Sequence, residues 1–231
     1  MESLERFKRD AAERALALVE SGMLLGLGSG STARHFIAGL GERLASGALT
    51  GVRGVPCSRE SEEQAAALGI PLVDLPAGGL DLAVDGMDEV TPGLDAIKGL
   101  GGALAREKIV ASSARRFVLI GDDRKRVSRL GERAPLPVEV LPFGLRRTRA
   151  LLEGLGAQPA LRGGEAEPYT TDNGNLIYDL TFPHGFAPGE LAAALAALPG
   201  VVEHGLFLGM AERAFIAGED GVHELVARHA A

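Results

Sequence analysis

The chain has 231 residues, of which 46% are hydrophobic and 24% charged, and its formal net charge is −7. This composition is typical of a globular protein with a sizeable core and excludes a disordered chain. The acidic balance argues against nucleic acid or an anionic membrane as the main partner, so an anionic substrate would need a local positive site.

The compartment follows from three further features of the chain. The first twenty residues form a charged amphipathic pattern rather than a signal peptide. No apolar run approaches the roughly 20 residues of a membrane span. A single cysteine allows no internal disulfide and favours a reducing compartment. We therefore expect a cytoplasmic protein that contacts no membrane.

Apolar strands alternate with helices through residues 1–130. Ser58 is expected to cap one of these helices. The alternation predicts a Rossmann-like α/β fold, in which a mostly parallel sheet has helices on both faces. The predicted elements are a helix at 3–20, a strand at 23–27, a helix ending near 44, a strand at 52–55, a helix at 59–68, strands at 70–74 and 80–84, a helix at 103–113 and a strand at 117–120.

The pattern changes near residue 131. The order β-α-β-β-α-β predicts a smaller ferredoxin-like α+β domain over 131–204. Asp172-Asn173-Gly174-Asn175 indicates a hairpin, since Asn-Gly supplies the positive φ angles of a tight turn. Two short strands at 214–217 and 222–226 are expected to return to the first sheet, so 1–130 and 205–231 would form the catalytic domain. The elements of the smaller domain are strands at 137–141, within 158–171, at 176–181 and at 201–208, and helices at 144–154 and 188–198.

A glycine- and serine-rich segment, Gly28-Ser29-Gly30-Ser31-Thr32, lies between a predicted strand and a predicted helix. Backbone amides, hydroxyls and the helix N-terminus would together attract an anion. The segment is not G-x-G-x-x-G, because Ser31 stands at the third glycine position, and it is not a P-loop. The strand 52–55 also lacks the terminal acidic residue that would hold an NAD ribose. The segment therefore favours a small phosphorylated molecule, with a plain capped turn as the alternative.

Two aspartates follow the predicted strand 80–84, at the strand end where open α/β sheets bind ligands. Carboxylates there can accept sugar hydroxyls or move protons. An ordinary Asp-Gly turn, a helix cap and a divalent metal site are the alternatives. No further oxygen or imidazole ligands follow at a recognisable spacing, so no metal is predicted. We expect Asp85 and Asp88 to contact substrate and Glu89 to be a solvated charge.

The segment from Lys98 to Lys108 begins as a glycine loop and continues as a helix. Glu107 falls about one turn inside that helix, and helical side chains lean toward the N-terminus. Glu107 can therefore lie over the loop that Lys98 enters from the other side. A carboxylate and an ammonium above backbone N–H groups suit proton transfer on a small anionic substrate. A surface glutamate and a solvated lysine are the alternatives, which the glycine-rich loop disfavours.

Two other residues have less distinctive surroundings. Lys125 follows the predicted strand 117–120 and would face a ligand or belong to a basic surface turn, two alternatives that the sequence leaves open. Cys57 is predicted to be a small buried residue rather than a nucleophile.

Taken together, these segments resemble ribose-5-phosphate isomerase of the A type, in an order and spacing that run over almost the whole chain. Met87, Leu100 and His204 depart from the alanine, glycine and asparagine common at those places in the family. Of these, Leu100 bears most directly on loop geometry. The resemblance is carried by Gly28–Thr32, Asp85–Glu89, Lys98–Ala103, Arg106–Ile109, Thr171–Asn175 and Pro199–Phe207.

The resemblance implies interconversion of ribose 5-phosphate and ribulose 5-phosphate without a cofactor, in the non-oxidative pentose phosphate pathway, by a homodimer or homotetramer. It implies that Glu107 is the base that transfers the proton. On this basis Asp85 would assist ring opening, and Lys98 with the glycine-loop amides would stabilise an enediolate. The implied substrate contacts are Ser29, Gly30, Ser31, Thr32, Asp85, Gly86, Met87, Asp88, Lys98, Gly99, Leu100, Gly101 and Lys125.

Three other functional classes remain as alternatives. A sugar-phosphate sensor would normally accompany a DNA-binding domain, and the chain has neither a helix-turn-helix pattern nor a basic face. A CoA transferase could use a glutamate as nucleophile, and an amino-sugar-phosphate deaminase is the related alternative. A nicotinamide-dependent oxidoreductase is disfavoured by the glycine pattern.

Overall fold

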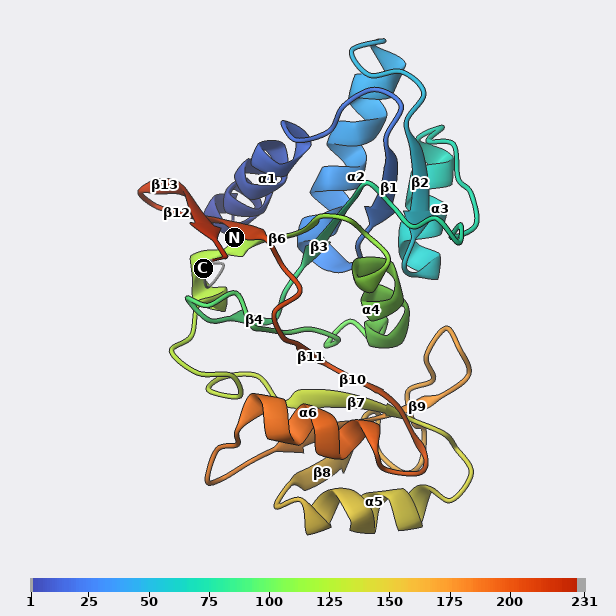
Figure 1. Ribbon diagram of the computed structural model, residues 1–231, viewed down its shortest axis with the longest axis vertical. Coiled ribbons are helices and arrows are strands. Elements are labelled where there is room, and N and C mark those ends of the chain that lie inside the picture. The colour runs from blue at the N-terminus through green and yellow to red at the C-terminus, as the bar shows by residue number, and fades with distance from the viewer. Residues whose placement is uncertain (1, 228–231) are drawn as a thin grey trace.

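The computed structural model describes residues 2–227 and consists of two bodies stacked along the long axis of the molecule (Figure 1). The larger body contains the first half of the chain and the C-terminal hairpin, and the smaller body contains the segment between them. Met1 and residues 228–231, which the sequence assigned to the catalytic domain, lie outside the described residues. The predicted division at residues 130 and 204 stays a prediction.

The larger body is built on a six-stranded sheet in the order β13-β12-β6-β3-β1-β2. Every neighbouring pair is parallel except β12 with β13, which are joined as an antiparallel hairpin. The predicted parallel sheet and the return of the C-terminal strands to it are both confirmed. The strands are β1 (Leu24–Leu27), β2 (Arg53–Pro56), β3 (Leu82–Gly86), β6 (Phe117–Asp122), β12 (Arg213–Gly218) and β13 (Gly221–Val226).

Helices cover both faces of this sheet, as the apolar strands require. On one face α1 (Glu2–Leu16), α2 (Gly30–Ala45) and α3 (Arg59–Ala67) bury a continuous apolar core against the strands. The other face packs against α4 (Leu104–Ser112) and a small three-stranded sheet. That sheet has the order β11-β5-β4 and was not predicted. Its strands are only two residues long: β4 (Glu89–Val90), β5 (Ala96–Ile97) and β11 (Leu206–Phe207).

The smaller body is a four-stranded antiparallel sheet in the order β10-β7-β9-β8. Two helices pack on one face, where alternate residues of β7 and β9 are apolar, as the period of a strand dictates. Counted within this body, the strand order is 4-1-3-2, so the predicted ferredoxin-like arrangement is confirmed. Its elements are β7 (Leu136–Val140), α5 (Leu145–Gly154), β8 (Gln158–Leu161), β9 (Leu176–Thr181), α6 (Pro188–Ala196) and β10 (Val201–His204).

Two predicted elements are wrong in extent or kind. The helix predicted at 3–20 ends at Leu16. Beyond it the N–H groups of Leu18 and Val19 donate to carbonyls three residues back instead of four, and Gly22 takes a φ of 87°. The strand predicted at 70–74 is a single bridge between Gly54 and Leu72. Pro71 has no N–H to continue a ladder there.

The strand predicted at 201–208 is also wrong, because it is divided at Gly205. The N–H of Gly205 donates to the Pro137 carbonyl at 2.8 Å, and its own carbonyl accepts from the Lys98 N–H at 2.9 Å. Gly205 therefore bonds to the small body through its N–H and to the larger body through its carbonyl. The predicted strand becomes two strands on either side of this residue, β10 in the small body and β11 in the three-stranded sheet (Figure 1).

Replacing Gly205 with alanine tests this junction. An added Cβ would lie 2.2 Å from the Lys98 carbonyl oxygen and 3.0 Å from Pro137 Cδ, so backbone must move. We expect Gly205→Ala to cost about 1–3 kcal/mol of stability and to lower the melting temperature. Gly154→Ala is the control, since Gly154 lies in α5 with nothing within 4 Å of an added Cβ. Equal melting temperatures for the two variants would contradict the close approach of Gly205 to Lys98 and Pro137.

Candidate active site

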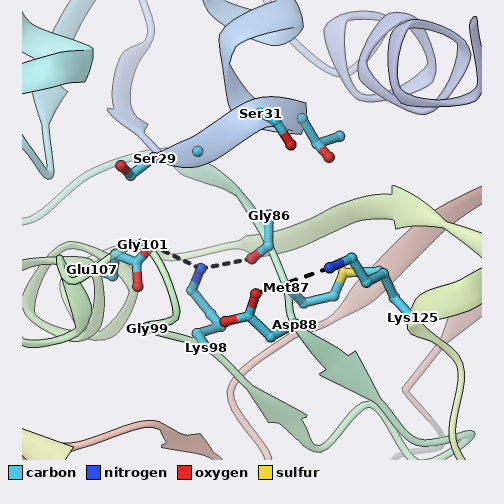
Figure 2. A pocket seen from close by; sticks show the side chains of 12 residues that line it. Ser29, Ser31, Gly86, Met87, Asp88, Lys98, Gly99, Gly101, Glu107 and Lys125 are labelled. Carbon is cyan, nitrogen blue, oxygen red and sulfur yellow. Dashed lines mark hydrogen bonds and ion pairs between the residues drawn. The ribbon is translucent and has the colours of Figure 1, made fainter. Parts of the chain in front are cut away.

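A pocket opens where the carboxyl ends of β1, β3 and β6 meet, the edge at which parallel α/β sheets bind ligands. It brings together residues from the β1–α2 turn, the end of β3, the glycine loop, α4 and the short 3₁₀ helix η1 (Asp123–Lys125) (Figure 2). Its lining consists of Ser29, Gly30, Ser31, Thr32, Gly86, Met87, Asp88, Lys98, Gly99, Gly101, Glu107 and Lys125. Of the predicted contacts, Asp85 and Leu100 are not in this lining.

The Lys98 ammonium is the centre of the site. Its Nζ lies 3.0 Å from Asp85 Oδ2, 3.1 Å from Glu107 Oε1 and 2.6 Å from the Gly86 carbonyl oxygen. The side chain is only 2% exposed. The carboxylates of Asp85 and Glu107, with a smaller contribution from Asp88, raise the pKa of Lys98 in spite of its burial, so the group stays a cation. The predicted pairing of Lys98 with Glu107 is therefore present.

Glu107 lies on the first turns of α4, directed toward the glycine loop as the lean of helical side chains predicted. Burial raises the pKa of Glu107 from 4.5 to about 8, against the opposing effect of Lys98. Only one carboxylate oxygen is bonded, since Oε2 is buried without a hydrogen-bond partner. A carboxylate with one free oxygen on a pocket wall is placed to accept a proton.

Asp85 lies behind the pocket wall rather than in it. Its Oδ1 accepts the backbone N–H groups of Ser29 at 2.9 Å and Gly86 at 2.7 Å, while Oδ2 faces Lys98. Burial raises the pKa of Asp85, although the neighbouring Lys98 opposes that rise. The backbone of Gly28 presses on this carboxylate, so that an added Cβ would lie 2.3 Å from Oδ1. Asp85 thus connects the β1–α2 turn to Lys98.

The same carboxylates could in principle hold a metal ion. Ligand atoms of Cys57, Asp85 and Glu107 lie within 4.8 Å of one another. The Lys98 ammonium already stands between the two carboxylates, however, and burial raises the pKa of the Cys57 thiol well above its usual range, which leaves it a poor ligand. This donor set does not fit a metal, and the prediction that Cys57 is buried is confirmed.

The glycine loop spans residues 99–102, with φ angles of 105° at Gly99 and 88° at Gly102. These are the two positions that require glycine. Leu100 has no positive φ angle, since Leu94 is the only such non-glycine residue in 2–227. A leucine therefore fits the loop without backbone strain. Its side chain is 41% exposed, and its N–H donates to Asp88 Oδ2 at 2.9 Å.

The other end of the pocket is formed by α2 and η1. Ser31 and Thr32 lie on the first turn of α2, and Lys125 extends from η1 on the side opposite Glu107 (Figure 2). Lys125 Nζ lies 4.0 Å from Asp88 Oδ1. Hydroxyls, a helix N-terminus and an ammonium make this end suited to a phosphate. Met87 lies between the ends and packs over Gly121.

Glu89 and the Asn-Gly turn differ from their predictions. Glu89 is 1% exposed, so the prediction of a solvated charge is wrong: its carboxylate accepts three backbone N–H groups, at 2.6–2.7 Å, from the loop that enters the small body. The turn predicted at 172–175 is present, but it does not form a hairpin between two strands. β8 already ends at Leu161, so a loop separates that strand from the turn. Instead Glu139, which is fully buried, accepts hydrogen bonds from Asn173 and Asn175.

The contacts that sequence reasoning missed all come from the small body. Arg106 Nε donates to Asn173 Oδ1 at 2.7 Å, and Lys108 Nζ donates to Glu203 Oε1 at 2.7 Å, so both neighbours of Glu107 in the chain are held. Arg162 contacts the glycine loop. Thr171–Asn175 and Pro199–Phe207 belonged to the resemblance, but Arg162 had no such signal. The capping of α3 by Ser58, which also accepts from Ser29 Oγ at 3.0 Å, was predicted and is confirmed.

Comparison with known proteins identifies the family. The family model for ribose 5-phosphate isomerase A (phosphoriboisomerase A) matches residues 53–221. The chain belongs to the ribose 5-phosphate isomerase A family. It is 50% identical to ribose-5-phosphate isomerase A of Deinococcus radiodurans, covering 96% of this chain and 98% of that one, and 56% identical to that of Roseiflexus castenholzii, covering 95% and 94%.

Solved structures agree with the sequence comparison. Ribose 5-phosphate isomerase from Plasmodium falciparum has a TM-score of 0.94 at 36% identity, over 98% of this chain and 100% of that chain. A D-ribose-5-phosphate isomerase in complex with phospho-erythronic acid has a TM-score of 0.92 at 38% identity, over 96% and 99%. The expected isomerase activity on ribose 5-phosphate and ribulose 5-phosphate is confirmed at the level of the family, and the three alternative classes are not supported. None of the helices in residues 2–227 could span a membrane.

The buried acid of this ribose 5-phosphate isomerase A site gives a pH-dependent stability. The folded chain keeps the Glu107 proton up to a pKa of about 8, whereas an unfolded chain releases it near 4.5. The free energy of unfolding that Glu107 contributes is therefore fully present below pH 4.5 and lost as the pH rises toward 8. Glutamine carries no such proton, so Glu107→Gln should raise the melting temperature more at pH 9 than at pH 5.

Thermal unfolding at both pH values measures this difference. Glu153→Gln is the matched control, because Glu153 lies on α5 in an exposed pair with Arg149 and should show no pH-dependent gain. An equal shift of the Glu107→Gln melting temperature at the two pH values would show that the carboxyl is not held in its protonated form.

Proposed function

We propose that Glu107 transfers the proton between carbons 1 and 2 of the open-chain pentose phosphate. Glu107 Oε2 takes the proton from carbon 2 of the aldose, which leaves an enediolate. It then returns that proton to carbon 1 while the hydroxyl proton of O2 passes to O1, which gives the ketose. No atom is gained or lost, and no oxidant or cofactor is required. The observation that supports this role is the free, buried Oε2 of Glu107 on the pocket wall, beside a fully buried ammonium.

Lys98 would stabilise the charge that appears in the transition state. Its ammonium is held rigidly by three acceptors before substrate arrives, so little reorganisation is needed when the enediolate forms. All three N–H groups of this ammonium already have acceptors, so Lys98 would act on the enediolate through its charge. The paired charges also restrain each other, because the same ammonium that stabilises the enediolate limits how far the pKa of Glu107 rises.

The arrangement of the pocket also orients the substrate. We place the phosphate at the end formed by Ser31, Thr32 and Lys125, because that end carries hydroxyls, the α2 N-terminus and a cation. Carbons 1 and 2 then lie at the Glu107 end. Asp88 lies between the two ends, where its carboxylate can accept a sugar hydroxyl. Direct assistance of ring opening by Asp85 stays a prediction, since Asp85 lies behind the pocket wall.

The ligand of a solved relative has the two kinds of anionic group that this proposal assigns to the pocket. Phospho-erythronic acid carries a phosphate at one end of a short polyol and a carboxylate at the other. A carboxylate is planar, anionic and bears two oxygens, as does the reacting part of an enediolate. Lys125 and Lys98 both line this pocket, so it offers a cation for each of the two anionic groups. A cytoplasmic homodimer or homotetramer that needs no cofactor remains part of the proposal.

The activity itself is tested by mixing chelator-treated protein with ribose 5-phosphate and following the ketose formed. A positioned base contributes about 10²–10⁴-fold, so Glu107→Gln should lower kcat by a factor in that range while KM changes little. Glu153→Gln should retain the natural rate. Near-normal turnover by Glu107→Gln would refute the assignment of the base, and an inactive natural chain would refute the proposed function.

The pH dependence follows from the ionisation of the base. Glu107 must be unprotonated to accept the proton, and its pKa is about 8 in the free protein. We expect kcat/KM to rise about tenfold per pH unit below that value and to level off above it. Lys98 stays charged across this range because its pKa is raised. A profile that is flat from pH 6 to 9 would mean that the base ionises at the ordinary carboxyl pKa.

A further inference from the structure

The glycine loop needs an external support, because glycines at 99 and 102 give its backbone more freedom than other residues would. From within the loop, the Gly102 N–H donates to the Gly99 carbonyl at 3.0 Å. From the large body, Asp88 binds the Leu100 N–H. The remaining partners of the carbonyl groups of residues 99–101 lie in the small body.

Those partners are Arg162 and Tyr169. Arg162 Nη1 donates to the carbonyl oxygens of both Gly99 and Leu100, at 3.0 Å each. The Tyr169 hydroxyl lies 3.4 Å from the Gly101 carbonyl oxygen, and its ring closes over Gly102, where an added Cβ would lie 2.2 Å from the hydroxyl oxygen. Each carbonyl of the loop tip is thus contacted by the small body.

Arg162 is itself held on a rigid support. Its Nε donates to Asp179 Oδ2 at 2.9 Å, and its Nη2 donates to Asp179 Oδ1, which is the bidentate geometry that favours arginine over lysine. Asp179 lies on β9, which has a neighbouring strand on each side. The Arg162 side chain is 15% exposed. The Arg162 guanidinium therefore connects β9, an inner strand of the four-stranded sheet, to the glycine loop.

The orientation of the loop amides follows from these contacts. In a trans peptide unit the C=O and N–H bonds point in opposite directions. Carbonyls directed at Arg162 from residues 99 and 100 therefore direct the N–H groups of Leu100 and Gly101 away from the small body. The Leu100 amide binds Asp88. The Gly101 amide makes no hydrogen bond within residues 2–227, and Gly101 lines the pocket.

We propose that Arg162 is a positioning residue for catalysis: it fixes the two peptide units of the glycine loop so that the Gly101 N–H is available to the enediolate. Arg162 does not touch the substrate and acts through Gly99 and Leu100. This inference rests on the proposed function, because it names the residue that orients part of the same transition-state site. The small body would then contribute to catalysis and not only to folding.

The test replaces Arg162 with methionine, which keeps much of the buried stem but removes all the donors. A misplacement of about 1 Å can cost roughly 10²-fold in rate, so we expect kcat of Arg162→Met to fall about 10- to 100-fold, with KM within about threefold of the natural value. The pH at which kcat/KM levels off should not move, since Arg162 has no contact with Glu107. Arg149→Met is the matched control, because Arg149 is an exposed arginine of the same body that pairs with Glu153 and Glu165. It should retain the natural rate.

Two ligands separate positioning from general damage to the pocket. Phospho-erythronic acid carries a planar carboxylate, whereas ribitol 5-phosphate has the phosphate and hydroxyls without a planar anion. Arg162→Met should raise the dissociation constant of phospho-erythronic acid by about the factor lost in kcat and leave that of ribitol 5-phosphate unchanged. Equal weakening of both ligands, or a natural kcat in the folded variant, would overturn the proposal.

Two milder variants keep the proposal falsifiable if Arg162→Met does not fold. Arg162→Lys keeps the charge but cannot reach Asp179 and two carbonyls together, and Asp179→Asn leaves the guanidinium with a weaker partner. Both should lower kcat in the same direction and by less, with the same selectivity between the two ligands. Full activity of both variants would overturn the proposal. An inactive natural chain would overturn the proposed function instead, so the two failures can be distinguished.

Discussion

The site depends on a single buried cation. An unpaired ammonium would be very costly on a side chain that is only 2% exposed, and the Lys98 ammonium is tolerated because two carboxylates and a carbonyl surround it. The ammonium in turn stabilises the charged forms of the two carboxylates, since each is buried and desolvation raises the pKa of each. Three groups that would each be unfavourable alone therefore form one stable set.

Much of the larger body serves to bring these groups together. Asp85 lies one residue before the end of β3, Lys98 follows β5, and Glu107 lies on α4, so the set joins three elements that the tertiary fold brings together. The set carries one more negative than positive charge when all its members are ionised. Burial is the main reason why Glu107 holds its proton more tightly than an exposed glutamate. The charge of Asp85 adds to this effect and that of Lys98 opposes it, and the result is a base matched to neutral or slightly basic pH.

The glycine loop introduces the opposite problem, because the freedom that lets its backbone approach a substrate also allows it to move away. Its amides and carbonyls are held from two directions: Asp88 of the large body takes an N–H, and Arg162 of the small body takes two carbonyls. Arg106 and Lys108 attach α4 to the small body in the same way. Within residues 2–227, the small body supplies no residue of the pocket lining, yet it contacts both the glycine loop and α4.

The sequence by itself determined the fold class and nearly all the pocket residues. Alternating apolar strands and helices predict a parallel sheet, and such a sheet places its ligands at strand ends, so Ser31, Asp88 and Glu107 could be found from local pattern. Arg162, Glu139 and the burial of Glu89 could not be predicted, and neither could the division of the last long strand at Gly205. Each of these depends on a partner distant in the chain, such as the carbonyls of residues 99 and 100 for Arg162. Local propensity and periodicity carry no information about which polar groups will meet across two packed bodies, and only the tertiary structure decides it.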